Sequence, residues 1–139
     1  MPDTPTNTVR AYAKGIEIAP RKVSIVASLV RGRSVADALV ILDHTQRRAA
    51  LPISKAIASA QANATNNHGL DGKSLTISKL SVTTGPRLKR FKPHMRGMAL
   101  PFQKKSSHIL VEVTGVEKVK KKPAVKKVAK PAEEIEEKK

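Results

Sequence analysis

The residues best suited to chemistry lie between positions 85 and 105, in the stretch GPRLKRFKPHMRGMALPFQKK, which holds seven Lys or Arg and no Asp or Glu. Cationic side chains keep their charge in water or place it on an anion, and they do not build a core. The pattern therefore predicts the binding of a polyanion. His94 and His108 lie in this stretch or just after it, where an imidazole can donate to a phosphate or a ribose hydroxyl.

We expect neither catalysis nor a metal site. The chain has no cysteine, which excludes disulfides, thiolate metal sites and Cys nucleophiles. The four histidines show no spacing that a metal site would use. The basic stretch offers no carboxylate to assist a histidine, so Ser107 and His108 do not indicate a triad. We predict no catalytic residue, no metal and no cofactor.

The overall charge agrees with a polyanionic partner. The 139 residues include 27 Lys+Arg against 11 Asp+Glu, for a formal net charge of +16. RNA, DNA and anionic membranes are the partners that such a charge attracts. Aromatic residues are only 2% of the chain, which disfavours both a membrane-surface peptide and stacking of bases on aromatic platforms. No apolar run approaches the roughly 20 residues needed to cross a bilayer, and we expect a cytoplasmic protein that binds phosphates without a membrane.

Local patterns predict how these residues are positioned. Pro20 and Gly32 bound a helix, Ser34 with Asp37 resembles a shortened capping box, and Pro52 predicts a kink or a helix start within a third helix. Gly15 interrupts an alternating strand, and the alternation of a later strand slips between residues 77 and 80. The predicted elements are a strand at 9–18, helices at 20–31, 34–43 and 46–66, and strands at 75–83 and 108–114.

These elements define the predicted fold class as α+β, with three helices packed on a small three-stranded antiparallel sheet. The last two strands flank the basic stretch, so we expect a long protruding β-hairpin over 85–105 that gains order on RNA. The predicted domain covers 9–115, after a flexible N-terminus at 1–8. From 116 to 139 the chain is rich in Lys, Ala, Pro and Glu, and we predict a disordered tail.

Several fragments, in order, resemble one known family. They include PRKVSIVASLVRG at 20–32, SAQANATNN at 59–67, GPRLKRFKP at 85–93, RGMA at 96–99 and KKSSHI at 104–109. Over roughly 9–114 the chain resembles the bacterial form of the large-subunit ribosomal protein family numbered twenty-two. The resemblance implies a structural, non-enzymatic protein that binds large-subunit ribosomal RNA and supports subunit assembly. It also implies that the hairpin lines the exit tunnel of the nascent polypeptide, near a narrowing shared with large-subunit protein four, and that its tip is associated with macrolide sensitivity.

The residues assigned to RNA contact combine this resemblance with the charge pattern. On the body they are Arg21, Lys22, Arg31, Lys55 and Asn63, for which an ordinary solvated helix surface is the alternative. On the arm and its root they are Arg87, Lys89, Arg90, Lys92, His94, Arg96, Lys104, Lys105, Ser107 and His108. The predicted hairpin tip comprises Arg90, Phe91, Lys92, Pro93, His94, Met95, Arg96, Gly97, Met98 and Ala99.

Three residues depart from the family pattern. Met98 and Pro101 stand where the family often has basic residues, so the returning limb of the hairpin is less cationic. Ala19 stands where Ser usually caps the first helix, which should cost about 1 kcal/mol. None of the three departures removes a cation from 85–97.

Two other classes of protein fit parts of the sequence. A DNA-compacting protein with β-arms also has a cationic hairpin, and Pro93 or Pro101 could act as its wedge. Such a protein would be a dimer and would prefer duplex DNA to structured RNA. An enzyme or chaperone acting on RNA would need a carboxylate cluster or a phosphate-cradling Gly-rich loop, and the sequence has neither.

Overall fold

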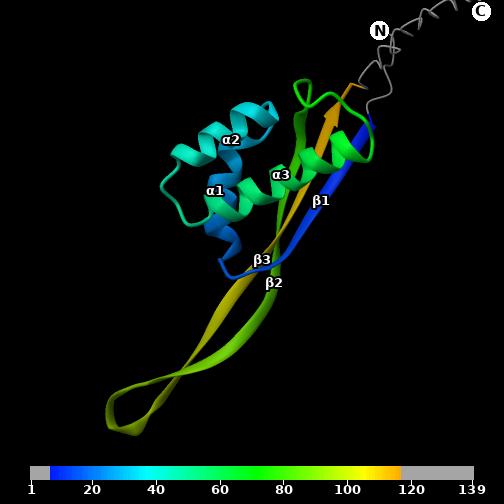
Figure 1. The fold of residues 1–139 in the computed structure, drawn as a ribbon. Coiled ribbons are helices and arrows are strands. Elements are labelled where there is room, and N and C mark those ends of the chain that lie inside the picture. Colours follow the sequence, from blue (N-terminus) through cyan, green and yellow to red (C-terminus); the bar gives the residue numbers. More distant parts are fainter. Residues whose placement is uncertain (1–6, 117–139) are drawn as a thin grey trace, which may run out of the picture.

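The fold is described by a computed structural model that covers residues 7–116. Its strand β3 is central and antiparallel to both neighbours, in the order β1-β3-β2. Figure 1 shows the three helices gathered over one half of the sheet, while β2 and β3 continue beyond them as a long ribbon. The α+β class with three helices and a three-stranded antiparallel sheet is therefore confirmed. The elements are β1 (Asn7–Ile16), α1 (Pro20–Val30), α2 (Val35–His44), α3 (Ala50–Asn66), β2 (Thr76–Pro93), the short 3-10 turn η1 (Met95–Gly97) and β3 (Ala99–Gly115).

The core lies between the helices and one face of the sheet. Ile109, Val111 and Val113 are fully buried, whereas Leu110 and Glu112 between them are only partly covered. Alternate residues of a strand point to opposite faces, so this pattern means that only one face is covered by helices. The helices contribute apolar side chains at helical spacing, including Val23, Val26 and Val30 from α1 and Ile53, Ile57, Ala60 and Ala64 from α3.

The helix ends follow from local chemistry. Pro20 is the first residue of α1, and Ala19 before it provides no side-chain cap, as predicted. Ser34 caps α2 because its Oγ accepts from the Asp37 N–H at 3.2 Å. Helix α3 begins at Ala50 and not at Pro52. Pro52 does not break the helix because the first four N–H groups of any helix lack an intrahelical partner.

The strands differ from the prediction mainly in length. β1 begins at Asn7, so residues 7 and 8 pair in the sheet and do not form a loose end. The expected irregularities are present, as register shifts between Ala13 and Ile16 and between Ile77 and Lys79. The pairing of β2 with β3 continues down to Pro93 opposite Ala99, well past the predicted strand ends. The arm is a paired ribbon in this structure, and the gain of order on RNA stays a prediction. The predicted tail lies outside the described residues from position 117 onward.

The tip of the ribbon is a tight turn. Met98 donates its backbone N–H to the Met95 carbonyl at 3.3 Å, and His94 donates to the Met98 carbonyl at 2.8 Å. The two central residues, Arg96 and Gly97, have φ of 55° and 74°. Two positive φ values are typical of a type I′ turn, whose twist matches a two-stranded ribbon.

Candidate nucleic-acid interface

The protruding part of the hairpin, residues 86–105, which we call the arm, is exposed along its whole length. It has no buried side chain that could hold it to the body, and its seven Lys or Arg face no acid within the arm. Because the two paired strands project beyond the body, their cations can contact a ligand that the body alone would not reach. The arm is therefore a cationic extension whose shape is set by backbone pairing.

The register of the arm decides which side chains share a face. One face carries the pairs Leu88 with Lys104, Arg90 with Phe102, and Lys92 with Leu100. Each of these pairs places a cation directly opposite an apolar side chain. The other face carries Arg87 opposite Lys105, then Lys89 opposite Gln103.

The rung formed by Arg87 and Lys105 is the strongest indication of an anion. Like charges directly opposite each other in a sheet repel, which destabilises the pairing. Both side chains are exposed, and Lys89 follows on the same face. An anion placed between such cations would relieve the repulsion, and a phosphate accepts charge-assisted hydrogen bonds from both side-chain types.

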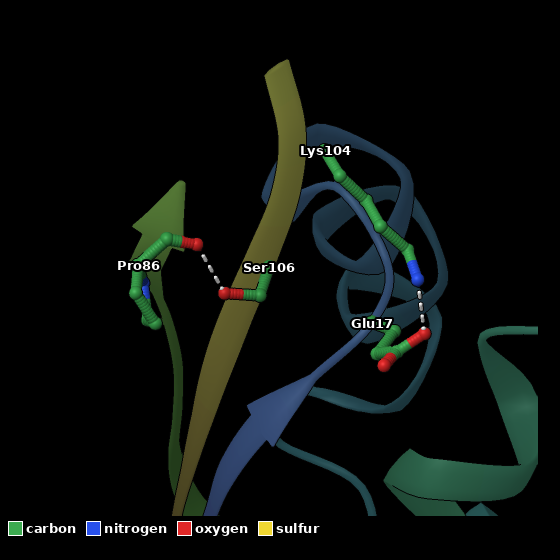
Figure 2. Close-up of polar contacts among 4 residues, drawn as sticks. All are labelled: Glu17, Pro86, Lys104 and Ser106. Carbon is green, nitrogen blue, oxygen red and sulfur yellow. Dashed lines mark hydrogen bonds and ion pairs between the residues drawn. The ribbon is translucent and has the colours of Figure 1, made fainter. Parts of the chain in front are cut away.

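The arm begins at an irregular point of β2. Thr84 pairs with Ser107 and Arg87 with Lys105, so Gly85 and Pro86 together oppose Ser106. A Cβ at Gly85 would lie 2.6 Å from the Ser106 Oγ, which leaves no room for a side chain. The Ser106 hydroxyl donates to the Pro86 carbonyl at 2.6 Å and so fixes this bulge (Figure 2).

Lys104 already has an anionic partner within the protein. Its Nζ donates to Glu17 Oε2 at 2.7 Å, and Figure 2 shows the two side chains meeting on the side of β3 away from Pro86. The hydrogen bond from Lys104, together with its positive charge, lowers the pKa of the Glu17 carboxyl. Lys104 therefore differs from the other arm cations, although the sequence placed it among them.

The two predicted residues at the arm root, Ser107 and His108, differ in exposure, because the first is buried and the second is only partly covered. Ser107 is fully buried, and its hydroxyl has no hydrogen-bond partner among residues 7–116, so it does not belong to an exposed interface. The Nδ1 of His108 accepts the Gly15 N–H at 2.9 Å, and its ring lies 5.9 Å from that of Tyr12. The remaining ring nitrogen, Nε2, is the atom of His108 that can donate to a ligand.

The predicted residues of the body also differ in whether their side chains already have a partner within the protein. Arg21, Lys22 and Lys55 are exposed. Arg31 uses its Nε to donate to the Leu80 carbonyl at 3.0 Å, and Asn63 uses its Nδ2 to donate to the Arg10 carbonyl at 3.3 Å. These last two side chains connect helices to the sheet, which gives them a structural role.

Two exposed arginines that the sequence analysis did not assign to the interface lie close to α1. Arg47 and Arg48 are exposed in the connection before α3, and with Lys22 they line a hollow whose floor includes Ile18 and Val26. The sequence reasoning missed them because it treated this segment only as the start of a helix. Two adjacent arginines in a connection were the signal that could have identified them.

Large apolar side chains are exposed on the arm as well. Phe91, Met95 and Met98 are 72%, 73% and 68% exposed, and Leu88, Leu100 and Phe102 are about half exposed. A water-facing arm does not need such residues, and their concentration toward the tip indicates a second, less polar contact there.

Residues 7–116 hold neither a metal-binding cluster nor a membrane-spanning helix. No group of three or more His, Cys, Asp or Glu residues in this part of the chain is arranged to hold a metal ion. Within the same residues, no helix is both long enough and apolar enough to cross a membrane. The described residues form a basic α+β domain whose helices cover one face of the sheet and whose cationic β-arm projects beyond them (Figure 1).

Comparison with known proteins identifies the family. Residues 11–114 match the model of the family described as ribosomal protein L22p/L17e. The chain is 48% identical over 105 residues to the large ribosomal subunit protein uL22 of Oceanobacillus iheyensis, covering 76% of this chain and 93% of that protein. It is also 48% identical over 107 residues to uL22 of Pediococcus pentosaceus (77% and 91%), and 44% identical over 119 residues to uL22 of Metamycoplasma hominis (84% and 92%). The chain belongs to the ribosomal protein L22p/L17e family, as its sequence suggested, and this family is structural and non-enzymatic.

Proposed function

We propose that this protein is a structural constituent of the large ribosomal subunit in the cytoplasm, where it binds large-subunit ribosomal RNA and supports subunit assembly. The observation that carries the proposal is the exposed arm, which holds seven Lys or Arg and no acid. The names of its relatives place those proteins in the large subunit, and the charge of this chain fits the same surroundings.

Neutralisation of phosphates is the proposed mechanism. Arg87, Lys89 and Lys105 form a cationic face near the root, and Arg90, Lys92 and Arg96 continue toward the tip. His94 and His108 add imidazole donors. On the body, Arg21, Lys22 and Lys55 extend the interface, together with Arg47 and Arg48 beside the start of α1. Contacts of this kind position a protein on folded RNA without reading base sequence.

The tip has a different proposed partner. Residues 90–99 would line the exit tunnel, close to large-subunit protein four and to the nascent polypeptide. Phe91, Met95 and Met98 support this because they are the most exposed large apolar side chains on the arm. Within the tip, Met98 stands where the family often has a basic residue, so this position offers apolar contact in place of charge.

The first test is sedimentation of a cell lysate, with detection of the protein across the gradient. Co-migration with the large subunit through a high-salt wash is expected. Migration with nucleoid DNA, or as a free dimer, would contradict the proposal and favour the DNA-compacting alternative.

A binding experiment then tests the arm face. Replacing Lys89 and Lys105 by Gln should flatten the dependence of log K on log salt by about 0.7–0.9 for each lost phosphate contact. The matched control replaces Lys73 and Lys79, two exposed body lysines outside the proposed interface, and should leave the slope unchanged. Equal effects from both pairs would show that total charge, and not the arm face, governs binding.

A further inference from the structure

The junction between body and arm is the place where the sheet loses a strand. β1 ends at Ile16, opposite Ser107, so beyond this level β3 pairs only with β2. Both neighbours of β3 are irregular here, with Lys14 and Gly15 opposite His108 on one side and Gly85 and Pro86 opposite Ser106 on the other. A two-stranded ribbon is twisted and only marginally stable by itself. Its direction therefore depends on what holds it at the junction.

One ion pair joins the segment after β1 to the arm. Glu17 lies one residue past the end of β1, and its Oε2 accepts from Lys104 Nζ at 2.7 Å. The other side-chain hydrogen bonds at this level, Gly15 to His108 and Ser106 to Pro86, join residues at or beside the bulges themselves. Among the side-chain bonds of residues 7–116, the Glu17–Lys104 pair is the one that connects the body to the arm beyond Ser106.

Glu17 places a negative charge at the root of a cationic arm. Residues 7–116 contain five acids, Glu17, Asp37, Asp43, Asp71 and Glu112. An unpaired carboxylate beside a phosphate-binding arm would repel the ligand. Glu17 avoids this because it pairs with Lys104, with the charge of Arg48 also nearby, just as Glu112 pairs with Arg10 of the neighbouring strand at 3.1 Å.

We propose that Glu17 and Lys104 are positioning residues, which together set the direction in which the arm leaves the body. Lys104 then acts through Glu17 and is not a phosphate ligand. Glu17 lies only three residues before Pro20, the first residue of α1, so the pair also links the arm to Arg21 and Lys22 on the body. The part of this inference that concerns RNA rests on the proposed function, whereas the part that concerns arm direction does not.

The ion pair should have a modest but measurable effect on the direction of the arm. Glu17 and Lys104 are 66% and 51% exposed, so solvent screens their attraction. An exposed ion pair of this kind changes the balance between held and released arm orientations by up to about fivefold. A change of that size broadens a distribution of distances without unfolding the domain.

The absence of cysteine makes a distance measurement direct. Spin labels on Met98→Cys at the tip and Val40→Cys on α2, both exposed, report the direction of the arm by pulsed electron resonance. We expect Glu17→Gln and Lys104→Met to broaden the distances equally, and the double variant to be no broader than either. The exchanged pair, Glu17→Lys with Lys104→Glu, should restore the narrow distribution.

Two controls match these charge changes. Asp43→Asn removes an exposed acid from α2, and Lys89→Met removes an arm cation, and both should leave the distances unchanged. An unchanged distribution in Glu17→Gln, or no recovery in the exchanged pair, would overturn the proposal.

RNA binding provides the second readout. The positioning role predicts that Glu17→Gln weakens binding by up to about fivefold, with an unchanged salt slope, although it removes a negative charge. Lys104→Met should weaken binding at least as much, because it also leaves the Glu17 carboxylate unpaired beside the arm. If Lys104 is instead a phosphate ligand, Lys104→Met alone lowers the slope by about 0.7–0.9, and the proposal is wrong. A protein that shows the expected distances but does not bind large-subunit RNA would contradict the proposed function and leave the positioning role standing.

Discussion

Replacing Gly85 by Ala is the sharpest test of how the arm is joined to the body. The new Cβ would lie 2.6 Å from the Ser106 Oγ and 3.2 Å from two backbone atoms, Ser106 C and Ser107 N. The hydroxyl can turn aside only by giving up its 2.6 Å bond to the Pro86 carbonyl. The backbone must then yield by a few tenths of an ångström in two paired strands.

These close contacts set the expected loss in the free energy of unfolding. Overpacking of a tight site costs about 1–3 kcal/mol, and the reduced freedom of the unfolded chain returns about 0.4–1 kcal/mol for Gly→Ala. We therefore expect Gly85→Ala to lower the free energy of unfolding by roughly 1–2 kcal/mol. The chain has no Trp, so urea unfolding followed by circular dichroism is the suitable assay.

Gly72 provides a matched control. A Cβ there would meet Thr65 Cγ2 at 3.5 Å, an ordinary contact, and the φ of Gly72 is not among the positive values. Gly72→Ala should therefore stabilise the domain by about 0.4–1 kcal/mol. Adding Ser106→Ala to Gly85→Ala removes the closest contact and should recover part of the loss. If Gly85→Ala is as stable as Gly72→Ala, the close approach of the two strands is not as described.

Three further predictions concern the body and the ion pair. Ile57→Ala empties a fully buried position and should cost about 2–5 kcal/mol in urea unfolding, whereas the exposed Val40→Ala should cost less than about 0.5 kcal/mol; similar losses would contradict the assigned core. Ser34→Ala removes the cap of α2 and should cost about 0.5–2 kcal/mol, and no loss would mean that the cap is not formed. The hydrogen bond and charge of Lys104 lower the pKa of Glu17, so the stabilisation by the pair is present above the ordinary glutamate pKa and is lost as pH falls through the lowered one. Carboxyl titration by NMR should show this lowered pKa, and Lys104→Met should raise it toward the ordinary value, although the charge of Arg48 still lowers it. A pKa that does not change in Lys104→Met would show that the pair is absent in solution.

The sequence was most informative where the signal is local. Alternating Ile109, Val111 and Val113 indicated a half-covered strand, and all three are fully buried. The cap at Ser34 and the interruption of the strand at Gly15 also depend on neighbours within a few residues, and both are present. The effect of Pro52 on the third helix was less well predicted, because it depends on where the helix begins. The helix begins at Ala50, so Pro52 lies in the first turn and causes no break.

The candidate site could be predicted only as a set of charges. The exposed, acid-free arm is already evident from composition, since no fold can bury seven cations without acids or an anion. Composition could not show which cations are free to bind a ligand and which already have a partner within the protein. Arg31 and Lys104 look like the other basic residues in the sequence, yet one donates to the Leu80 carbonyl and the other to Glu17.

Such partners are decided by register, which tertiary structure alone sets. Glu17 and Lys104 lie 87 positions apart, and they meet because the register of β1 with β3 brings Ile16, the residue before Glu17, opposite Ser107. A shift of one residue turns every side chain of a strand to the other face, so it would move Lys104 away from Glu17 and bring Ser107 out of the core. Local chemistry determines the helices, the strand faces and the excess of charge. The long-range pairing of three strands determines which charges find a partner within the protein and which stay exposed on the arm.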